Sequence, residues 1–306
     1  MSITFILSKL WYIINFITLS EENIRMIESM IHKFIWSNSM ELIKRNTLIL
    51  PYESGGLNSV CLRAKIETSQ IQNYINILNN NERMFYQISS KYLKFELRET
   101  NIFKNFNLIP ACNKRPKIYN EISKSVKRIR SIDSYFFNNI KKYNSKYTYN
   151  KLLDSYSIKP KIESWDVCDD WSSVYKNIHN AIENSDMRAF LYKLIFHALP
   201  VENRFNYKKN MCFFCVKNKE DVSHVFYNCH KTNSLFDLVK EPLDERNFIL
   251  SKHSFWFKIT LSKHDYKYIS IFLYSVWLVR EKLRKGTKSN IKILFNNIFI
   301  NQLNNM

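Results

Sequence analysis

Apolar residues recur at helical spacing in several separate stretches of the chain. One stretch places Ile24, Ile27 and Ile31 on a common face, and a later one does the same with Ile122 and Val126. Residues three or four positions apart lie on one side of an α-helix, so each stretch predicts an amphipathic helix. The pattern predicts helices at about 20–35, 60–79, 118–132, 190–198 and 265–285.

Residues with strong positional preferences mark the ends of several predicted helices. Ser20 is suited to cap a helix start, and the two glutamates that follow it interact favourably with the helix dipole. Pro200 and Gly286 are typical of helix ends. Between the first two helices, RNTLILPYESGGL predicts an extended piece that stops at Pro51 and turns at the glycine pair beginning with Gly55.

The 306-residue chain contains only three glycines. Tight hairpins and phosphate-binding loops need positive backbone φ angles, which glycine usually supplies, so this scarcity disfavours both. We therefore predict a mainly α protein. Its length and its 45% apolar content are those of a globular chain with two or three domains. The segment SIKPKIES, 157–164, is the best candidate for a linker.

Positive charge is concentrated in part of the chain. The net charge is +19, and residues 113–151 contain eleven Lys and Arg against two acidic residues. Such a balance predicts a polyanionic partner, nucleic acid first and an acidic membrane surface second. Within this stretch the predicted amphipathic helix carries Lys124, Lys127, Arg128 and Arg130 away from its apolar face. These residues are either a nucleic-acid-binding face or the solvated face of an ordinary helix in a chain of AT-rich codon bias.

Three of the six cysteines and one histidine lie close together in MCFFCVKNKEDVSHVFYNC. Their order is Cys212-x2-Cys215-x8-His224-x4-Cys229, in which the first pair can chelate an ion from a single turn. Three thiolates and one imidazole leave no open position and favour structural, tetrahedral zinc over a catalytic metal. His230 is a second choice for the fourth ligand, and the alternative is a set of buried cysteines packed among phenylalanines.

Basic and aromatic residues surround the cysteine cluster. Candidates for nucleic-acid contact are Arg204, Lys208, Lys209, Phe213 and Lys217. Basic groups next to an exposed ring are suited to backbone contact combined with base stacking. The aromatic residues are equally suited to form the small core of the module.

The remaining features point to an intracellular, non-membrane protein. The other three cysteines are scattered, which is not the framework of a small secreted domain. No run reaches the roughly 18 apolar residues of a membrane span. The apolar start, MSITFILSKLWYIINFITLS, lacks an early basic region and places Lys9 inside it, unlike a signal peptide.

The stretch FLYKLIFHALPVENRFNYKKNMCFFCVKNKEDVSHVFYNC resembles the zinc-binding domain that follows the polymerase in LINE-type non-LTR retrotransposon reverse transcriptases. The residues that carry the resemblance are Leu199, Pro200, Cys212, Cys215, Glu220, His224, Phe226 and Cys229. YTYNKLLDSY and WSSVYKNI resemble the leading helices of that domain, and YSVWLVREKLRKG resembles the Trp-and-Arg helix that often follows it. Near the N-terminus, LSKLWYIINFITLSEENIRMIESMIHKFIW and LILPYESGGL resemble the end of the polymerase thumb.

This resemblance implies three regions and a binding function. A thumb-like helical region would cover 1–80, a basic helical connector 81–160, and a zinc-binding C-terminal domain 161–306, with its zinc module at about 200–232. The implied partners are template RNA or target DNA and the rest of the reverse transcriptase polyprotein. The implied cofactor is structural Zn²⁺.

The resemblance also implies that catalysis lies elsewhere. In this family the palm carboxylates that hold two catalytic metals precede the thumb, and we expect this chain to begin after them. Asp169 and Asp170 come directly before WSSVYKNIHNAI and are interpreted as acids at a helix start. We therefore expect no catalytic residues and no independent polymerase activity. The alternatives are a zinc-stabilised protein-interaction module and an endonuclease, for which KEPLDERNF supplies a few acids.

Overall fold

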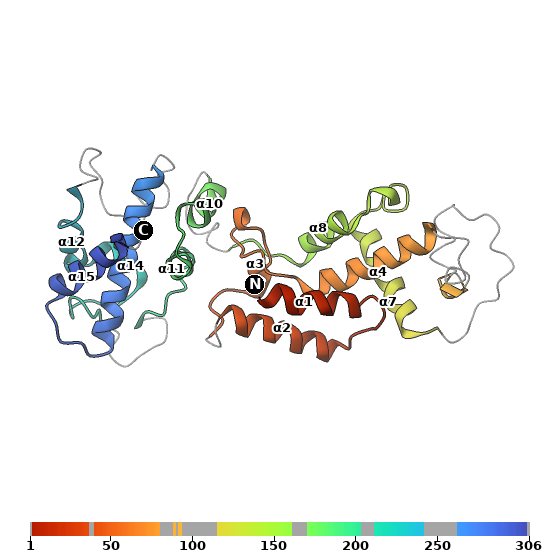
Figure 1. Ribbon diagram of the computed structural model, residues 1–306, viewed down its shortest axis with the longest axis horizontal. Helices are drawn as coiled ribbons and strands as arrows, with labels where there is room; N and C mark the ends of the chain where they lie inside the picture. Colours follow the sequence, from red (N-terminus) through yellow and green to blue (C-terminus); the bar gives the residue numbers. More distant parts are fainter. Residues whose placement is uncertain are drawn as a thin grey trace. The chain divides into compact units, whose positions relative to one another are not determined.

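The computed structural model describes residues 2–36, 40–79, 88–89, 91–93, 115–160, 170–202, 211–241 and 262–304. Within these ranges every regular element is a helix and no strand occurs, which confirms the mainly α prediction (Figure 1). In the same ranges no helix is both long and apolar enough to cross a membrane.

The chain divides into two compact units, which are described separately. Unit 1 consists of residues 1–41, 45–50 and 58–158. Unit 2 consists of residues 42–44, 51–57 and 159–306. A short piece of the N-terminal half, 51–57, therefore belongs to the same unit as the cysteine cluster.

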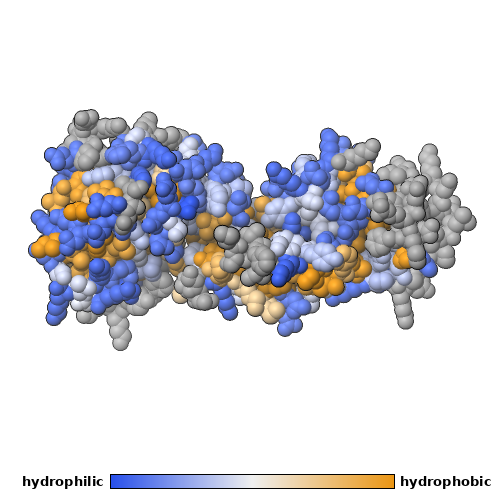
Figure 2. All heavy atoms as spheres, viewed as in Figure 1, coloured by the Kyte–Doolittle hydropathy of each residue, from blue (hydrophilic) through white to orange (hydrophobic). Residues whose placement is uncertain are grey.

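Unit 1 is a set of packed helices. Its elements are α1 (Ser2–Ile13), α2 (Glu21–Ile35), α3 (Arg45–Leu48), α4 (Leu62–Asn79), α7 (Lys117–Ile132), the 3-10 turn η3 (Ile140–Lys142) and α8 (Ser145–Tyr156). Ser20 caps α2 as predicted, because its Oγ accepts the backbone N–H of Asn23 at 3.2 Å. Ile13 of α1 and Met30 of α2 are among the exposed apolar residues of this unit. Figure 2 shows apolar surface over this part of the unit.

The core of unit 1 forms where α4 packs against α7 and α8. Ile71 and Tyr74 of α4 are fully buried, and so are Ile129 of α7 and Leu152 of α8. Helix α4 comes from the expected thumb-like region, whereas α7 and α8 come from the expected basic connector. These two stretches of sequence share one hydrophobic core.

Helix α7 is amphipathic, as the sequence predicts. Ile122, Val126 and Ile129 are buried, and Lys124 and Lys127 are exposed on the same helix. The predicted apolar face ends one turn early, because Ile132 is 37% exposed.

Unit 2 is built around one long helix. Its elements are η1 (Tyr52–Ser54), α10 (Trp171–Ala181), α11 (Ser185–Ile195), the π-helical turn η5 (His224–Asn228), α12 (His230–Phe236), α14 (Lys263–Arg284) and α15 (Ile291–Asn304). Helix α14 packs against α10, α11 and α15, and its residues Ile269, Phe272 and Val276 are fully inaccessible to solvent. Gly286 follows α14 with a left-handed φ of 88°, as predicted for a helix end.

The stretch RNTLILPYESGGL is not the extended piece that we predicted. Arg45–Leu48 form the short helix α3, and Tyr52–Ser54 form a 3-10 turn. Tertiary hydrogen bonds explain the difference, since the amide of Asn46 donates to the Tyr156 carbonyl and the hydroxyl of Thr47 donates to the Ile158 carbonyl. The predicted turn is present at Gly55, where φ is 79°.

Candidate metal centre

A compact turn carries the first two cysteines of the cluster. Met211 and Lys219 form an isolated antiparallel bridge, and the backbone N–H of Cys212 donates to the Asn218 carbonyl at 2.9 Å. The N–H of Val216 donates back to the Cys212 carbonyl at 2.9 Å. Val216 adopts a left-handed φ of 55°, an unfavourable value for a β-branched residue, so the surrounding contacts must hold it there.

The other two candidate ligands flank a π-helical turn. His224 begins η5, where the Asp221 carboxylate accepts its backbone N–H at 2.7 Å, and Cys229 follows the last residue of that turn. A π-helix forms i→i+5 hydrogen bonds, so residues five positions apart lie on nearly the same side. This uncommon local geometry allows His224 and Cys229 to face one centre.

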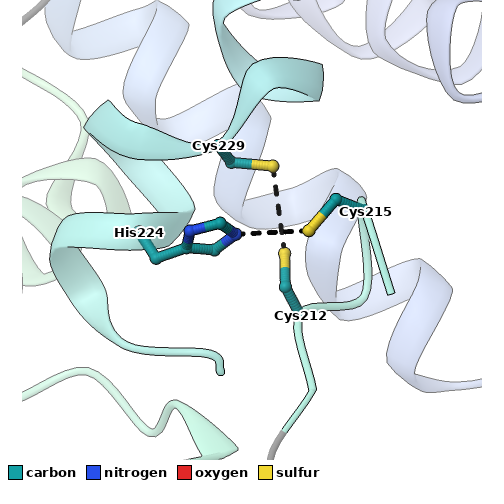
Figure 3. A group of neighbouring side chains, drawn as sticks. All are labelled: Cys212, Cys215, His224 and Cys229. Carbon is teal, nitrogen blue, oxygen red and sulfur yellow. Dashed lines mark hydrogen bonds between the residues drawn. The ribbon is translucent and has the colours of Figure 1, made fainter. Parts of the chain in front are cut away.

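The four predicted ligands converge on one point in the interior of unit 2 (Figure 3). Their ligand atoms all lie within 4.8 Å of one another, and all four residues are buried. The Sγ atoms of Cys212 and Cys229 are 4.0 Å apart, and the Sγ of Cys215 is 3.3 Å from Nε2 of His224. This cluster could hold a metal ion.

Two of the separations between ligand atoms are close to those around a tetrahedral ion. Zinc bonds of about 2.3 Å to sulfur and about 2.0 Å to nitrogen would place two sulfurs about 3.8 Å apart and a sulfur about 3.5 Å from a nitrogen. The observed pairs differ from these values by only a few tenths of an ångström. His230, the second choice for the fourth ligand, is exposed and is not in the cluster.

Backbone N–H groups create a favourable environment for thiolates in this cluster. The hydrogen bond from Cys212 lowers the pKa of Cys229, and the N–H groups of Thr232 and Lys231 at the start of α12 act in the same direction. The same hydrogen bond, together with burial, raises the pKa of Cys212. These contacts favour the thiolate form of Cys229, which is the form that binds metal ions.

The predicted basic residues of α7 differ in the contacts that their side chains make within unit 1. Lys127 is exposed, and Lys124 forms a 2.8 Å ion pair with Glu121 on the same helix. Arg130 is exposed, although its guanidinium lies 5.4 Å from the ring centre of Phe137.

Arg128 is bound most tightly into the fold. Its guanidinium stacks on Tyr156 at 4.2 Å, donates to the Ser155 hydroxyl and lies 3.5 Å from a carboxylate oxygen of Glu67. A structural role therefore accounts for the position of Arg128.

The predicted contact residues beside the cysteine cluster are only partly described. Arg204, Lys208 and Lys209 lie outside the described residues. Lys217 is exposed on the Cys-bearing turn. Phe213 is half-buried, and the guanidinium of Arg280 lies 5.1 Å from its ring centre, so one face of this candidate stacking ring already has a neighbour.

Asp170 has the helix-start role predicted for it. Its carboxylate accepts the backbone N–H of Ser173 at 3.1 Å at the beginning of α10, whereas Asp169 lies outside the described residues. This arrangement is an ordinary N-cap.

The spacing of cysteines and histidine gave no signal for Arg280. This fully buried side chain of α14 pairs with Glu220, sixty residues away in sequence, directly beside the Cys-bearing turn. The resemblance of YSVWLVREKLRKG to a Trp-and-Arg helix includes Arg280 but gave it no role.

Comparison of the chain with protein-family models, with curated proteins and with solved structures finds no match.

Proposed function

We propose that this chain is the C-terminal part of a non-LTR retrotransposon reverse transcriptase, which binds template RNA or target DNA and contains one structural zinc ion. The observation that carries the proposal is the Cys3His cluster. Its four ligands converge in one buried site and occur in the order in which the resembled zinc-binding domain has them.

The donor set favours zinc over other metals. Three sulfurs and an imidazole nitrogen are soft or borderline ligands, whereas Mg²⁺ and Ca²⁺ prefer oxygen. All four ligand residues are buried, as expected for a closed structural site. Such an ion would stabilise the fold of residues 211–229, because the free energy of metal binding contributes directly to folding.

The basic face of α7 supports nucleic-acid binding. Lys124, Lys127 and Arg130 are all exposed on this helix, so a phosphate backbone can approach them. Each phosphate contact releases bound counterions, so affinity should fall with salt by about 0.7–0.9 log units per contact for each tenfold rise in salt concentration.

The salt dependence of binding tests this proposal. We expect Lys127→Gln with Arg130→Gln to reduce the slope of log affinity against log salt by about two, for single-stranded RNA and duplex DNA of any sequence. The control exchanges Lys9 and Lys33, which are exposed on α1 and α2, for Gln. An equal reduction of the salt slope in both double variants would mean that net charge, and not the position of the residues on α7, determines binding.

Other outcomes would replace the proposal. Binding that does not depend on salt, or no binding to RNA and DNA, would favour the zinc-stabilised protein-interaction module. Nicking of DNA by the purified chain in the presence of a divalent metal would favour the endonuclease. We expect no primer extension, since no palm carboxylates are assigned to this chain and Asp170 caps a helix.

A further inference from the structure

Two oppositely charged side chains are completely buried next to the metal centre. Arg280 of α14 and Glu220 both have no solvent-exposed surface. Removing two ions from water costs several kcal/mol each, which their attraction offsets only if the remaining polar atoms are also hydrogen-bonded. Such a pair therefore needs a complete set of partners.

The carboxylate of Glu220 has partners at both oxygens. Oε1 accepts hydrogen bonds from two guanidinium nitrogens of Arg280, one of them at 3.2 Å. It also accepts a hydrogen bond from the backbone N–H of Glu202 at 3.1 Å. Oε2 accepts the backbone N–H of Phe213 at 3.3 Å. Phe213 is the residue after Cys212, so the Glu220 carboxylate binds the backbone directly next to the first candidate ligand.

Arg280 holds the same turn from the side of α14. Its guanidinium also pairs with Glu281 and lies 3.7 Å from a carboxylate oxygen of Glu202. The ring centres of Phe213 and Trp277 are 5.1 Å and 5.0 Å from it. The guanidinium therefore contacts the Cys-bearing turn through both charge and an aromatic ring.

We propose that Glu220 and Arg280 are positioning residues of the metal site. They fix the turn that carries Cys212 and Cys215 against α14 and thereby set the affinity for the ion. Without the pair, the N–H groups of Phe213 and Glu202 lose their buried acceptor, and the turn samples arrangements in which the ligands do not converge. The inference rests on the metal site of the proposed function and does not require that the chain bind nucleic acid.

Metal affinity measured by competition with a chelator tests the inference. We expect Glu220→Gln and Arg280→Lys to weaken Zn²⁺ binding by about 10- to 100-fold, the usual loss when an outer-shell partner of a metal site is replaced. Stoichiometry should stay at one ion per chain, and the absorption spectrum of the Co²⁺-loaded variants should remain tetrahedral, because all four ligands are retained.

A stability-matched control separates positioning from a general loss of folding. Phe299 of α15 packs against Tyr268 and Phe295 in the same unit, and Phe299→Leu lowers stability without changing the contacts described above. We expect this variant to bind Zn²⁺ within about threefold of the parent chain at a comparable fall in Tm. The milder Arg280→Lys keeps the charge and serves if Glu220→Gln does not fold.

The outcomes distinguish this inference from the proposed function. Affinities of both positioning variants within twofold of the parent, or losses no larger than that of Phe299→Leu, would overturn the inference while the metal site stands. A parent chain that binds no Zn²⁺ or Co²⁺ would overturn both. Double replacement of Glu220 and Arg280 should weaken binding little more than either single change, since the two act as one pair.

Discussion

Units 1 and 2 both contain a glutamate–arginine contact, but they bury it to different extents. In unit 1, Arg128 is 38% exposed and its partner Glu67 also accepts the Tyr156 hydroxyl. In unit 2, Arg280 and Glu220 are fully buried. The first pair lies at the margin of a core that three long helices complete, whereas the second joins the long helix α14 to residue 220, in a stretch with little regular structure.

Among the residues that the structure describes, the candidate metal site lies in unit 2, and the local structure there is unlike that of the unit 1 core. Helices α4, α7 and α8 satisfy their own backbone groups and bury continuous apolar faces. Residues 211–229 instead contain mostly turns, one bridge, and a helical turn of which five residues are π-helical. An ion with four protein ligands, together with a saturated buried pair, can supply the order that regular hydrogen bonding does not supply there.

Metal removal should produce the largest difference between the units. We expect a strong chelator under reducing conditions to abolish hydrogen-exchange protection across residues 211–236 and to leave α4 and α7 protected. Structural zinc contributes about 10–16 kcal/mol of apparent binding free energy in small zinc modules, which is comparable to the whole folding stability of a domain. Equal loss of protection in both units would remove the contrast between them.

Two buried cysteines supply a matched control for that experiment. Cys215 is 8% exposed in unit 2, and Cys61 is 7% exposed in unit 1. We expect Cys215→Ser to lower bound zinc well below one ion per chain and Cys61→Ser to leave it unchanged, by elemental analysis. Unchanged zinc in Cys215→Ser would contradict the ligand assignment.

A smaller effect is expected at Gly55, which belongs to unit 2 despite its place in the N-terminal half. Its φ is 79°, and an added Cβ would lie 2.7 Å from Pro160 and 2.8 Å from Tyr175. We expect Gly55→Ala to lower the free energy of unfolding of unit 2 by about 2–5 kcal/mol, from backbone strain and overpacking together.

Gly286 provides the control for this substitution, since its φ is 88° and nothing lies within 4 Å of an added Cβ. Gly286→Ala should lower the free energy of unfolding by about 1–2 kcal/mol, because only the strain of a left-handed backbone is added there. Urea unfolding followed by hydrogen exchange in each unit separates the two effects. Equal costs for both variants would mean that segment 51–57 does not pack closely in unit 2.

The sequence predicted what is encoded locally. Helical periodicity located α2, α4, α7 and α14 closely, and spacing within 18 residues identified the four candidate ligands. Contacts between distant residues were missed, because neither the Glu220–Arg280 pair nor the tertiary hydrogen bonds that favour α3 leave a local pattern. An apolar run such as TLIL is compatible with a strand or a buried helix, and here tertiary partners decided.

The smallest predicted effect concerns the less buried pair. Burial raises the pKa of Glu67 above its ordinary value of 4.5, although the Tyr156 hydroxyl and Arg128 act in the opposite direction. Folding therefore takes up a proton at pH values between the unfolded-state pKa and the raised folded-state pKa of Glu67. The contribution of Glu67 to stability is complete below the unfolded-state pKa and declines as the pH rises through the folded-state pKa. The total decline is about 1.4 kcal/mol for each unit by which folding raises the pKa.

Glu67→Gln should remove this decline from the pH dependence of the free energy of unfolding between pH 4 and pH 7. Glu22→Gln, at an exposed position on α2, should retain it. A decline that persists in Glu67→Gln would mean that the carboxylate is as well solvated in unit 1 as in the unfolded chain, and the contrast in buried charge would then rest on Glu220 and Arg280 alone.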